Sequence, residues 1–393
     1  MSVVPVRLSG VDEVVRYSYR LRPGVQAERA LVAEWDRCRF LWNEAVHQQK
    51  SGGRLTFGKL GKLLTEARGR TAWLRAGSQV AQQQTLRTYA QALDHSFKVK
   101  GRGRPTFKPR KKALPSLEYT VRGFSIRDGR LLLPKGVSIP VVWSRELPSE
   151  PTSVRVTRDS LGHWYASFVV RREVKTVPVA QGGVGIDWGV STTATTTDTE
   201  FDLPFLGHRK RCAAELAKAQ RRMARRRSGK RGPQSGGYQR AAREVAKLHK
   251  KAARQTRHDS RVWAKRVVAE HGLIAVEDFR PKFLAKSTMA RKAADAAIGA
   301  ALRELIERGV RAGRRVVLVQ PAYTSMTCSD CFARAKRLEL CERTFRCPDC
   351  GFTAGRDRNA ARVILVVAER GHSSVEDVRQ AGHLPRVGGS VAV

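Results

Sequence analysis

Four of the seven cysteines form two C-x-x-C pairs, the residue pattern with the clearest metal chemistry in this chain. Together the pairs read C-x₂-C-x₁₅-C-x₂-C, a spacing that fits two knuckles around one tetrahedral Zn²⁺ ion. Their members are Cys328, Cys331, Cys347 and Cys350. Four thiolates would complete the coordination of zinc, so we expect one structural site that folds a segment with little core of its own. Cys341 lies between the pairs and is expected to be a bystander, with a ligand exchange as the alternative.

Three acidic residues lie at the borders of apolar segments. Asp187 lies in VGIDWG, Glu277 ends the run LIAVE, and Asp357 opens the segment DRNAARVILVV. A carboxylate beside buried strands is costly unless a cation neutralises it. Each acid alone has an ordinary structural explanation: an aspartate bonded to nearby backbone amides, a salt-bridged glutamate and a helix N-cap.

Taken together, the three acids favour a metal site, because like charges brought close cannot all stay ionised without a cation. Oxygen ligands with open coordination positions suit Mg²⁺, and two such ions about 4 Å apart can drive phosphodiester cleavage. The set therefore predicts a metal-dependent nuclease with a ribonuclease-H-like fold. The cysteine ribbon just before Asp357 would hold this third carboxylate in register with the other two.

Basic residues greatly outnumber acidic ones, since 75 Lys+Arg stand against 35 Asp+Glu and the formal net charge is +40. Such a polycation needs a polyanionic partner, and nucleic acid is the one we expect. A membrane is disfavoured, because the sequence has neither an apolar run of 18 or more residues nor the apolar core of a signal peptide. A cytoplasmic, nucleoid-associated location is expected, where reducing conditions favour metal over disulfides.

The first half of the chain predicts strands and helices in separate blocks. Residues 14–21 predict a strand, and residues 26–49 and 78–97 predict two amphipathic helices. The segment 98–112, KVKGRGRPTFKPRKK, is too rich in Gly, Pro and charge for either and is expected to be a basic loop. Short alternating strands within residues 117–170 predict a small barrel or sandwich, and the helices would be an insertion in it.

The second half predicts alternating sheet and helix. VGIDWGVSTTATTT is typical of a strand hairpin, LIAVE and RRVVLV of further strands, and residues 294–309 of a helix. Residues 209–266 hold 21 Lys/Arg against three acids and predict a basic helical hairpin whose positive face needs a partner. The tail from residue 371 is expected to be poorly ordered.

The series GIDWG, VEDF, YTSMTCSDC…CPDCG and RDRNAA resembles the RuvC-type nuclease of the TnpB family. These proteins are transposon-encoded RNA-guided DNA endonucleases, and their relatives are the miniature type V CRISPR effectors. The likeness covers roughly residues 14–369, since YSYRLRPGVQAERAL, CRFLWNEAV and GRLLLPKG resemble the family's wedge strands and recognition helices. Two residues depart from the family pattern: Phe332 stands where a glycine is common, and Trp188 is bulky for its place between Asp and Gly.

The resemblance implies a catalytic role and Mg²⁺ ligation for Asp187, Glu277 and Asp357, and zinc ligation for the four paired cysteines. It also implies an α/β plus all-β architecture, a RuvC nuclease domain with an inserted zinc ribbon and an N-terminal β-barrel with an inserted helical domain. The implied domains are the wedge (residues 1–24 and 113–180), the recognition domain (25–112), the nuclease (181–322 and 355–370, with the basic hairpin at 207–266), the zinc ribbon (323–354) and a tail (371–393).

The implied activity is cleavage of target DNA under the direction of a guide RNA, next to a short recognised motif. No protein partner is required, and a dimer is compatible with the resemblance. The alternatives are a miniature CRISPR effector, a non-cleaving guided repressor, a ribonuclease-H-fold transposase and a zinc-ribbon ribosomal protein. The basic residues expected to bind nucleic acid are Arg104, Lys108, Arg110, Arg221, Arg222, Arg225 and Arg226.

Overall fold

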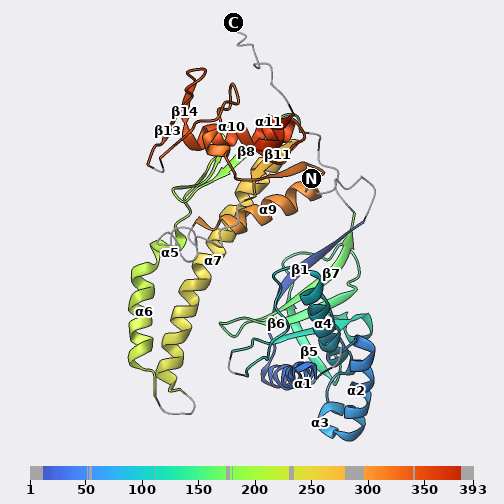
Figure 1. Cartoon of the computed structure of the whole chain (residues 1–393). Coiled ribbons are helices and arrows are strands. Elements are labelled where there is room, and N and C mark those ends of the chain that lie inside the picture. The colour runs from blue at the N-terminus through green and yellow to red at the C-terminus, as the bar shows by residue number, and fades with distance from the viewer. Residues whose placement is uncertain are drawn as a thin grey trace. The chain divides into compact units, whose positions relative to one another are not determined.

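The computed structural model (Figure 1) consists of two compact units, which we describe separately. The first is Asp12–Glu173, and the second comprises the described residues beyond it. No described helix is both long enough and apolar enough to cross a membrane. The structure describes residues 12–50, 52, 55–110, 112–173, 178, 180–229, 234–278, 296–339 and 341–381.

The first unit is built on an antiparallel sheet of seven strands in the order β2-β6-β7-β1-β5-β4-β3. β1 pairs along its whole length with β7 and at its end with β5, so the strand that precedes the helices lies inside the sheet. The helices are therefore an insertion between β1 and β2. The strands are β1 (Glu13–Leu21), β2 (Ser116–Thr120), β3 (Ser125–Arg127), β4 (Arg130–Leu133), β5 (Val137–Val142), β6 (Ser153–Arg158) and β7 (Trp164–Arg172).

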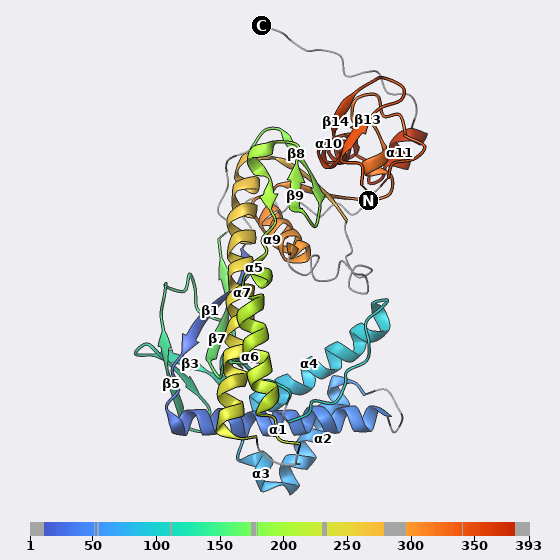
Figure 2. The ribbon, with the colours of Figure 1, turned by 90° about the vertical axis from the view of Figure 1, so that its left-hand side faces the viewer.

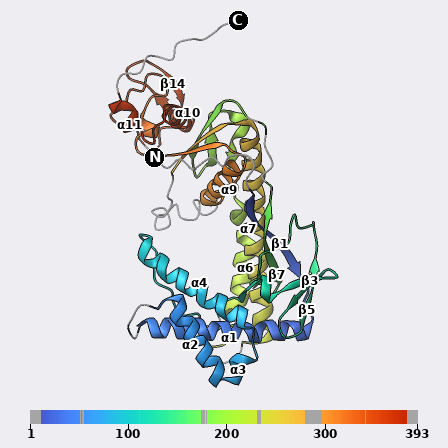
Figure 3. The ribbon, with the colours of Figure 1, turned by 90° about the vertical axis from the view of Figure 1, so that its right-hand side faces the viewer.

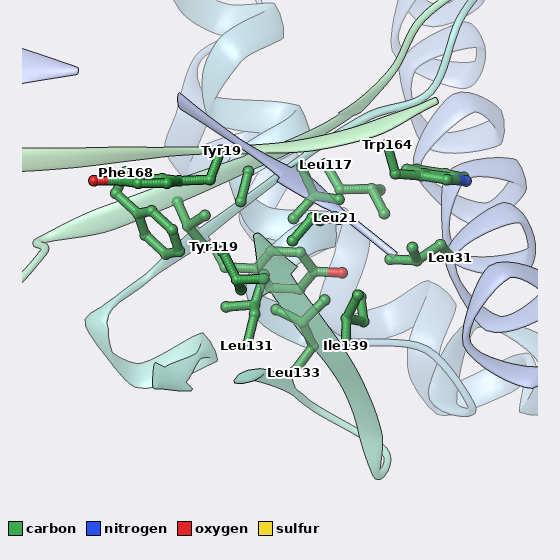
Figure 4. Packing of buried hydrophobic residues seen from close by; sticks show 14 of the residues in the cluster. Tyr19, Leu21, Leu31, Leu117, Tyr119, Leu131, Leu133, Ile139, Trp164 and Phe168 are labelled. Atoms are coloured by element: carbon green, nitrogen blue, oxygen red, sulfur yellow. The ribbon is translucent and has the colours of Figure 1, made fainter. Parts of the chain in front are cut away.

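Alternating apolar residues of these strands meet in one core (Figure 4). Tyr19, Leu117 and Ile139 come from β1, β2 and β5, and each is almost fully buried. Leu31 of the first helix packs on the same core. Within the described residues β2 and β3 remain edge strands, so hydrogen bonding does not close the expected barrel completely.

The inserted helices form a second core of their own (Figure 3). The predicted pair corresponds to the long α1 and α4, which pack against each other, while α2 and α3 lie between them in the chain. Thr56 and Ser78 cap α2 and α4 by accepting backbone N–H bonds from Lys59 and Ala81. The helices are α1 (Val25–Lys50), α2 (Phe57–Arg70), α3 (Ala72–Arg75) and α4 (Gln79–Lys98).

The second unit contains a five-stranded sheet in the order β10-β9-β8-β11-β12. β8 and β9 form the predicted antiparallel hairpin, whereas β8, β11 and β12 run parallel. The run LIAV that precedes Glu277 is apolar throughout because helices cover both faces of the sheet. The strands are β8 (Gly183–Trp188), β9 (Thr192–Thr196), β10 (Leu203–Pro204), β11 (Leu273–Glu277) and β12 (Arg315–Val319).

Alternate residues of the parallel strands face different helices. Ile274 and Val276 pack with α7 (Gly236–Glu270) and α9 (Ile298–Arg311), whereas Ala275 packs with α10 (Arg356–Glu369). The helix expected at residues 294–309 thus corresponds to α9, although residues before 296 lie outside the described part.

The basic segment forms a helical hairpin of α6 (Ala213–Arg225) and the first part of α7, which lie side by side (Figure 2). Short α5 (His208–Arg211) precedes it. No residue of α6 is buried, so the hairpin presents its charged side chains to solvent.

The expectation of a poorly ordered tail from residue 371 is wrong for its first part. Val375–Gln380 forms helix α11, capped by Ser374, and its Val375 and Val378 are buried against α10 and β12. Two apolar residues three positions apart make one helix face, which is enough to dock a short helix on an existing core. Residues 382–393 of the expected tail lie outside the described residues.

Candidate active site and metal centre

Two neighbouring parallel strands place two of the predicted carboxylates together. Ile186 of β8 pairs with Val276 of β11, so the next residues, Asp187 and Glu277, emerge side by side at the carboxyl ends of their strands. Their carboxyl groups are near enough to shift each other's pKa: Glu277 raises that of Asp187, and Asp187 lowers that of Glu277.

The third carboxylate, Asp357, comes from the first turn of α10. Gly185 permits the close approach of this helix to β8, since a Cβ atom there would lie 1.9 Å from the carbonyl oxygen of Ala361. α10 packs on β8, the strand that carries Asp187, and the charge of Asp357 raises the pKa of the Asp187 carboxyl. The three acids are more widely spaced than ligands of a single small ion, because only the cysteines among the described residues form a group of three or more within 4.8 Å.

Burial makes negative charge expensive at this site. Glu277 is only 7% exposed, and burial, followed by the neighbouring charge of Asp278, raises the pKa of its carboxyl from 4.5 to about 7. Burial, then the charges of Glu277 and Asp357, raise the pKa of Asp187 well above its ordinary value of 3.8. A bound cation would remove this penalty, and carboxylate oxygens are the ligands that Mg²⁺ prefers. The donor set therefore fits a divalent metal.

Trp188, noted in the sequence only as bulky, joins the two strands that carry the acidic pair. Its indole Nε1 donates to the carbonyl oxygen of Glu277 at 3.1 Å. Its ring is buried and contacts Trp263 of α7 edge-on at 5.9 Å between centroids. The end of β11 is thus tied to β8 directly beside the carboxylates. Sequence reasoning missed this role, and the size of the residue was the only signal for it.

The four paired cysteines converge into one cluster. The Sγ atoms lie 3.7 Å apart for Cys328 and Cys350 and 3.5 Å apart for Cys331 and Cys347. A tetrahedral zinc with bonds of ~2.3 Å would place its sulfur ligands about 3.8 Å apart, so the cluster is compatible with zinc. Cys341 is exposed and lies outside the cluster.

The ribbon around the cluster is small and depends on these residues. Its strands β13 (Thr344–Arg346) and β14 (Thr353–Gly355) form a two-stranded sheet, and its few buried apolar groups centre on Phe345 and the thiols. The backbone N–H of Cys350 donates to the Sγ atom of Cys347 at 3.5 Å, as in a turn that cradles a thiolate. A core this small needs an additional stabilising crosslink, such as a bound metal ion.

Phe332 follows the second cysteine with a backbone φ of 62°, in the left-handed region that favours glycine. The glycine that the resemblance led us to expect here would adopt this conformation without strain. The phenylalanine side chain is 8% exposed and packs on Val317 and Val319 of β12 and on residues of α10. The departure from the family pattern therefore exchanges backbone strain for a contact between ribbon and sheet.

The three basic-loop residues that the sequence predicted to bind nucleic acid differ in their surroundings. Arg104 is exposed and stacks over Phe97, and Arg110 is exposed and lies 3.8 Å from Asp36. Lys108 is half-buried, with its Nζ atom 3.3 Å from the ring centroid of Trp42, and burial lowers the pKa of its ammonium to about 8. This placement favours an anchoring role for Lys108 over the phosphate contact that the sequence suggested.

The hairpin arginines named from the sequence are all exposed. Arg221, Arg222 and Arg225 lie on α6, and Arg226 follows it and donates to the carbonyl oxygen of Gly237 at 3.2 Å. Arg226 thus closes the hairpin, while the side chains on α6 extend into solvent.

Two family models match the chain, one described as "Probable transposase" over residues 167–288 and one as "Cas12f1-like, TNB domain" over residues 300–364. The solved structure of a Cas12f1–sgRNA–target DNA complex is similar in fold, with a TM-score of 0.52 and 13% identity over 90% of this chain and 98% of that chain. The fold is therefore that of the RuvC-type effectors.

Two curated proteins are similar over nearly the whole length, and both are named as RNA-guided DNA endonucleases. The one from Streptomyces pristinaespiralis is 30% identical over 95% of this chain and 94% of its own length. InsQ from Escherichia coli K12 is 29% identical over 89% of this chain and 91% of its own. The chain belongs to the TnpB family.

Proposed function

We propose that this protein is an RNA-guided DNA endonuclease that cleaves its target with a divalent-metal site formed by Asp187, Glu277 and Asp357. One observation carries the proposal: two acids at the ends of adjacent parallel strands, Glu277 buried and Asp187 half-buried, with a third acid in the first turn of α10. The names of the two full-length relatives supply the reaction class.

The residues would act as a set of metal ligands from two sides. Asp187 and Glu277 would bind the cation as carboxylates from the strand ends, and Asp357 would contribute from the helix. Bound Mg²⁺ ions, two in this proposal, would supply an activated water and stabilise the leaving oxygen of the scissile phosphodiester. The cysteine cluster would hold one structural Zn²⁺, which has no open position for substrate.

Guide RNA and target DNA are the proposed partners, because the chain carries a charge of +40 and the Cas12f1 structure of similar fold is a complex with both. Sequence specificity would then reside in base pairing with the guide. We assign the unit Asp12–Glu173 to the wedge and recognition domains, and the exposed arginines of α6 to phosphate contacts. A cytoplasmic location follows from these partners.

The test uses the full chain, its co-purified RNA and a matched plasmid. Asp187→Ala should abolish cleavage and leave guided binding of the same DNA intact, because the change removes a metal ligand and no nucleic-acid contact. Glu270→Gln, which alters an exposed carboxylate in the same unit, is the control and should cleave normally. Cleavage should also stop when Mg²⁺ is omitted and return when it is added. Undiminished cleavage by the Asp187 variant would refute the proposed site.

A further inference from the structure

Four consecutive residues, Arg356 to Asn359, begin α10 and include the proposed ligand Asp357. The helix gives its own first turn little support, because its N-cap is Gly355 and no side chain caps it. The three neighbours of Asp357 in this segment each bind a different part of the second unit. Their contacts fix the backbone on both sides of the carboxylate.

Arg358 binds the nuclease sheet. Its guanidinium donates to both oxygens of Asp202, at 2.7 Å and 3.0 Å, and also to the carbonyl oxygen of Thr196 at the end of β9. The Asp202 carboxylate in turn accepts from the backbone N–H of Thr196 at 2.8 Å. This forked geometry is rigid, and a lysine could not reproduce it.

Asn359 binds the cysteine ribbon. It is fully buried, its Nδ2 donates to the carbonyl oxygen of Thr327 at 2.7 Å, and its Oδ1 accepts from the backbone N–H of Ser329 at 2.9 Å. These two groups flank Cys328, the first thiol of the cluster. The side-chain amide of Asn359 therefore binds the backbone of the first cysteine knuckle on both sides of Cys328.

Arg356 binds the far side of the same ribbon. Its Nη1 donates to the carbonyl oxygen of Glu339 at 2.7 Å, and its Nη2 lies 3.4 Å from the hydroxyl of Ser325. The contacts of this one turn bridge sequence separations of up to 162 residues, the largest between Arg358 and Thr196. Of these four consecutive residues, Arg356, Arg358 and Asn359 are thus bound to neighbouring segments, and Asp357 is left to act as a metal ligand.

We propose that Arg356, Arg358 and Asn359 are positioning residues that hold Asp357 against the acidic pair, and that Asn359 couples this carboxylate to the state of the cysteine cluster. The inference rests on the proposed function, since it takes Asp357 to be a metal ligand. The cysteine ribbon then acts as more than an isolated staple, because loss of its order releases one side of the nuclease site.

The first test measures binding of Mn²⁺, a paramagnetic substitute for Mg²⁺, to the RNA-free full chain by electron paramagnetic resonance. We define site-specific binding as the Mn²⁺ binding that the parent protein shows and the Glu277→Gln variant lacks. Arg358→Lys should weaken this binding about tenfold, as expected for loss of an outer-shell contact, and Asp202→Asn should do the same. Arg334→Lys is the matched control: the Arg334 side chain pairs with Glu376 at 2.7 Å and lies over the Tyr323 ring, and the substitution keeps the backbone bridge of Arg334 to Thr327. It should leave the affinity unchanged.

The second test examines the coupling. Extraction of zinc should weaken Mn²⁺ binding of the parent protein, whereas in Asn359→Ala the affinity should already be low and should fall little further on extraction. Hydrogen exchange in the first turn of α10 should accelerate in parallel, which reports the loosening without any need for activity.

The outcomes separate the two proposals. If the parent protein shows no Mn²⁺ binding that depends on Glu277, the proposed metal site fails, and the positioning role fails with it. If that binding is present and Arg358→Lys matches the Arg334→Lys control, only the positioning role is overturned. Additive effects of zinc extraction and Asn359→Ala would overturn the coupling.

Discussion

Phe332 combines a backbone conformation that favours glycine with a side chain that is almost completely buried. The left-handed conformation costs a residue with a Cβ atom ~1 kcal/mol or more. Burial of a phenylalanine against a packed core contributes more than this, on the order of 3 kcal/mol. The side chain therefore outweighs the strain, and the ribbon is attached to the sheet at this residue.

Two substitutions of Phe332 separate the free energy of the side-chain contact from that of the backbone strain. Phe332→Ala should lower stability by about 3 kcal/mol, because it loses the contact and keeps the strain. Phe332→Gly loses the same contact but relieves the strain, so it should be ~1 kcal/mol more stable than the alanine variant. The measurement is the urea concentration at which the zinc-loaded chain releases its metal to a chromogenic chelator. An alanine variant as stable as the glycine variant would contradict the strain argument.

Lys108 shows why a basic residue in a basic loop need not bind phosphate. The ammonium lies on the ring of Trp42, and the backbone of Lys108 is held by Asn43, whose Oδ1 accepts from its N–H at 2.7 Å. These partners lie on α1, far from the loop in sequence, so composition alone could not single out the buried lysine from its exposed neighbours.

Salt dependence of nucleic-acid binding distinguishes an anchor from a phosphate contact. Lys108→Met should bind guide RNA within about threefold of the parent protein and with the same salt slope, because the thioether chain fills the aromatic cage. Arg104→Ala should lower the slope of log K against log salt by about one phosphate contact. A reduced slope for Lys108→Met would instead assign Lys108 to a phosphate.

At the scale of elements, the sequence predicts what local pattern determines. Apolar runs that end in acids predict strands whose carboxyl ends meet, and β8 and β11 place Asp187 and Glu277 accordingly. Cysteine spacing likewise predicts the cluster. The close packing of α10 on β8 depends on Gly185, whose absent side chain carries no periodic signal. Contacts such as Arg358 with Asp202 depend on tertiary structure and could not be read from either segment.

The helix α11 and the expected barrel illustrate the same limit. A tail with scattered small residues predicts disorder, yet Val375 and Val378 find an apolar surface that α10 and β12 have already formed. Short strands predict a barrel or sandwich, but β2 and β3, which are neighbours in the chain apart from η1 (Val121–Gly123), lie at opposite edges of the observed sheet. Long-range packing decides both outcomes.

At the scale of the whole molecule, the excess positive charge and the acidic pair both oppose folding, and each needs a bound partner of the opposite charge. A net charge of +40 opposes compaction unless a polyanion is bound, and the acidic pair opposes it unless a cation is bound. Both penalties disappear in the proposed complex with nucleic acid and metal. Stability should therefore be highest in the assembled state.

The acidic pair makes this linkage measurable as a pH dependence. The pKa of Glu277 is raised in the folded chain from 4.5 to about 7, so its contribution to stability is complete below pH ~4.5 and is lost as the pH rises through about 7. Without divalent ions, the parent protein should thus lose up to about 3 kcal/mol relative to Glu277→Gln between these limits. Mg²⁺ at 100 times its dissociation constant should restore about 2.7 kcal/mol to the parent at pH 8 and nothing to the variant.

The measurement compares urea unfolding of the two zinc-loaded proteins at pH 5 and pH 8, with and without Mg²⁺. The glutamine variant keeps the size of the side chain and removes the charge, so the difference between the proteins isolates the carboxylate from the many other groups that titrate. Since the folded-state pKa is the raised one, the variant should gain on the parent as the pH increases and lose that advantage when Mg²⁺ is added. A gap that stays constant with pH would mean that the pKa of Glu277 is not raised, and a gap that Mg²⁺ leaves unchanged would mean that Glu277 is not a metal ligand.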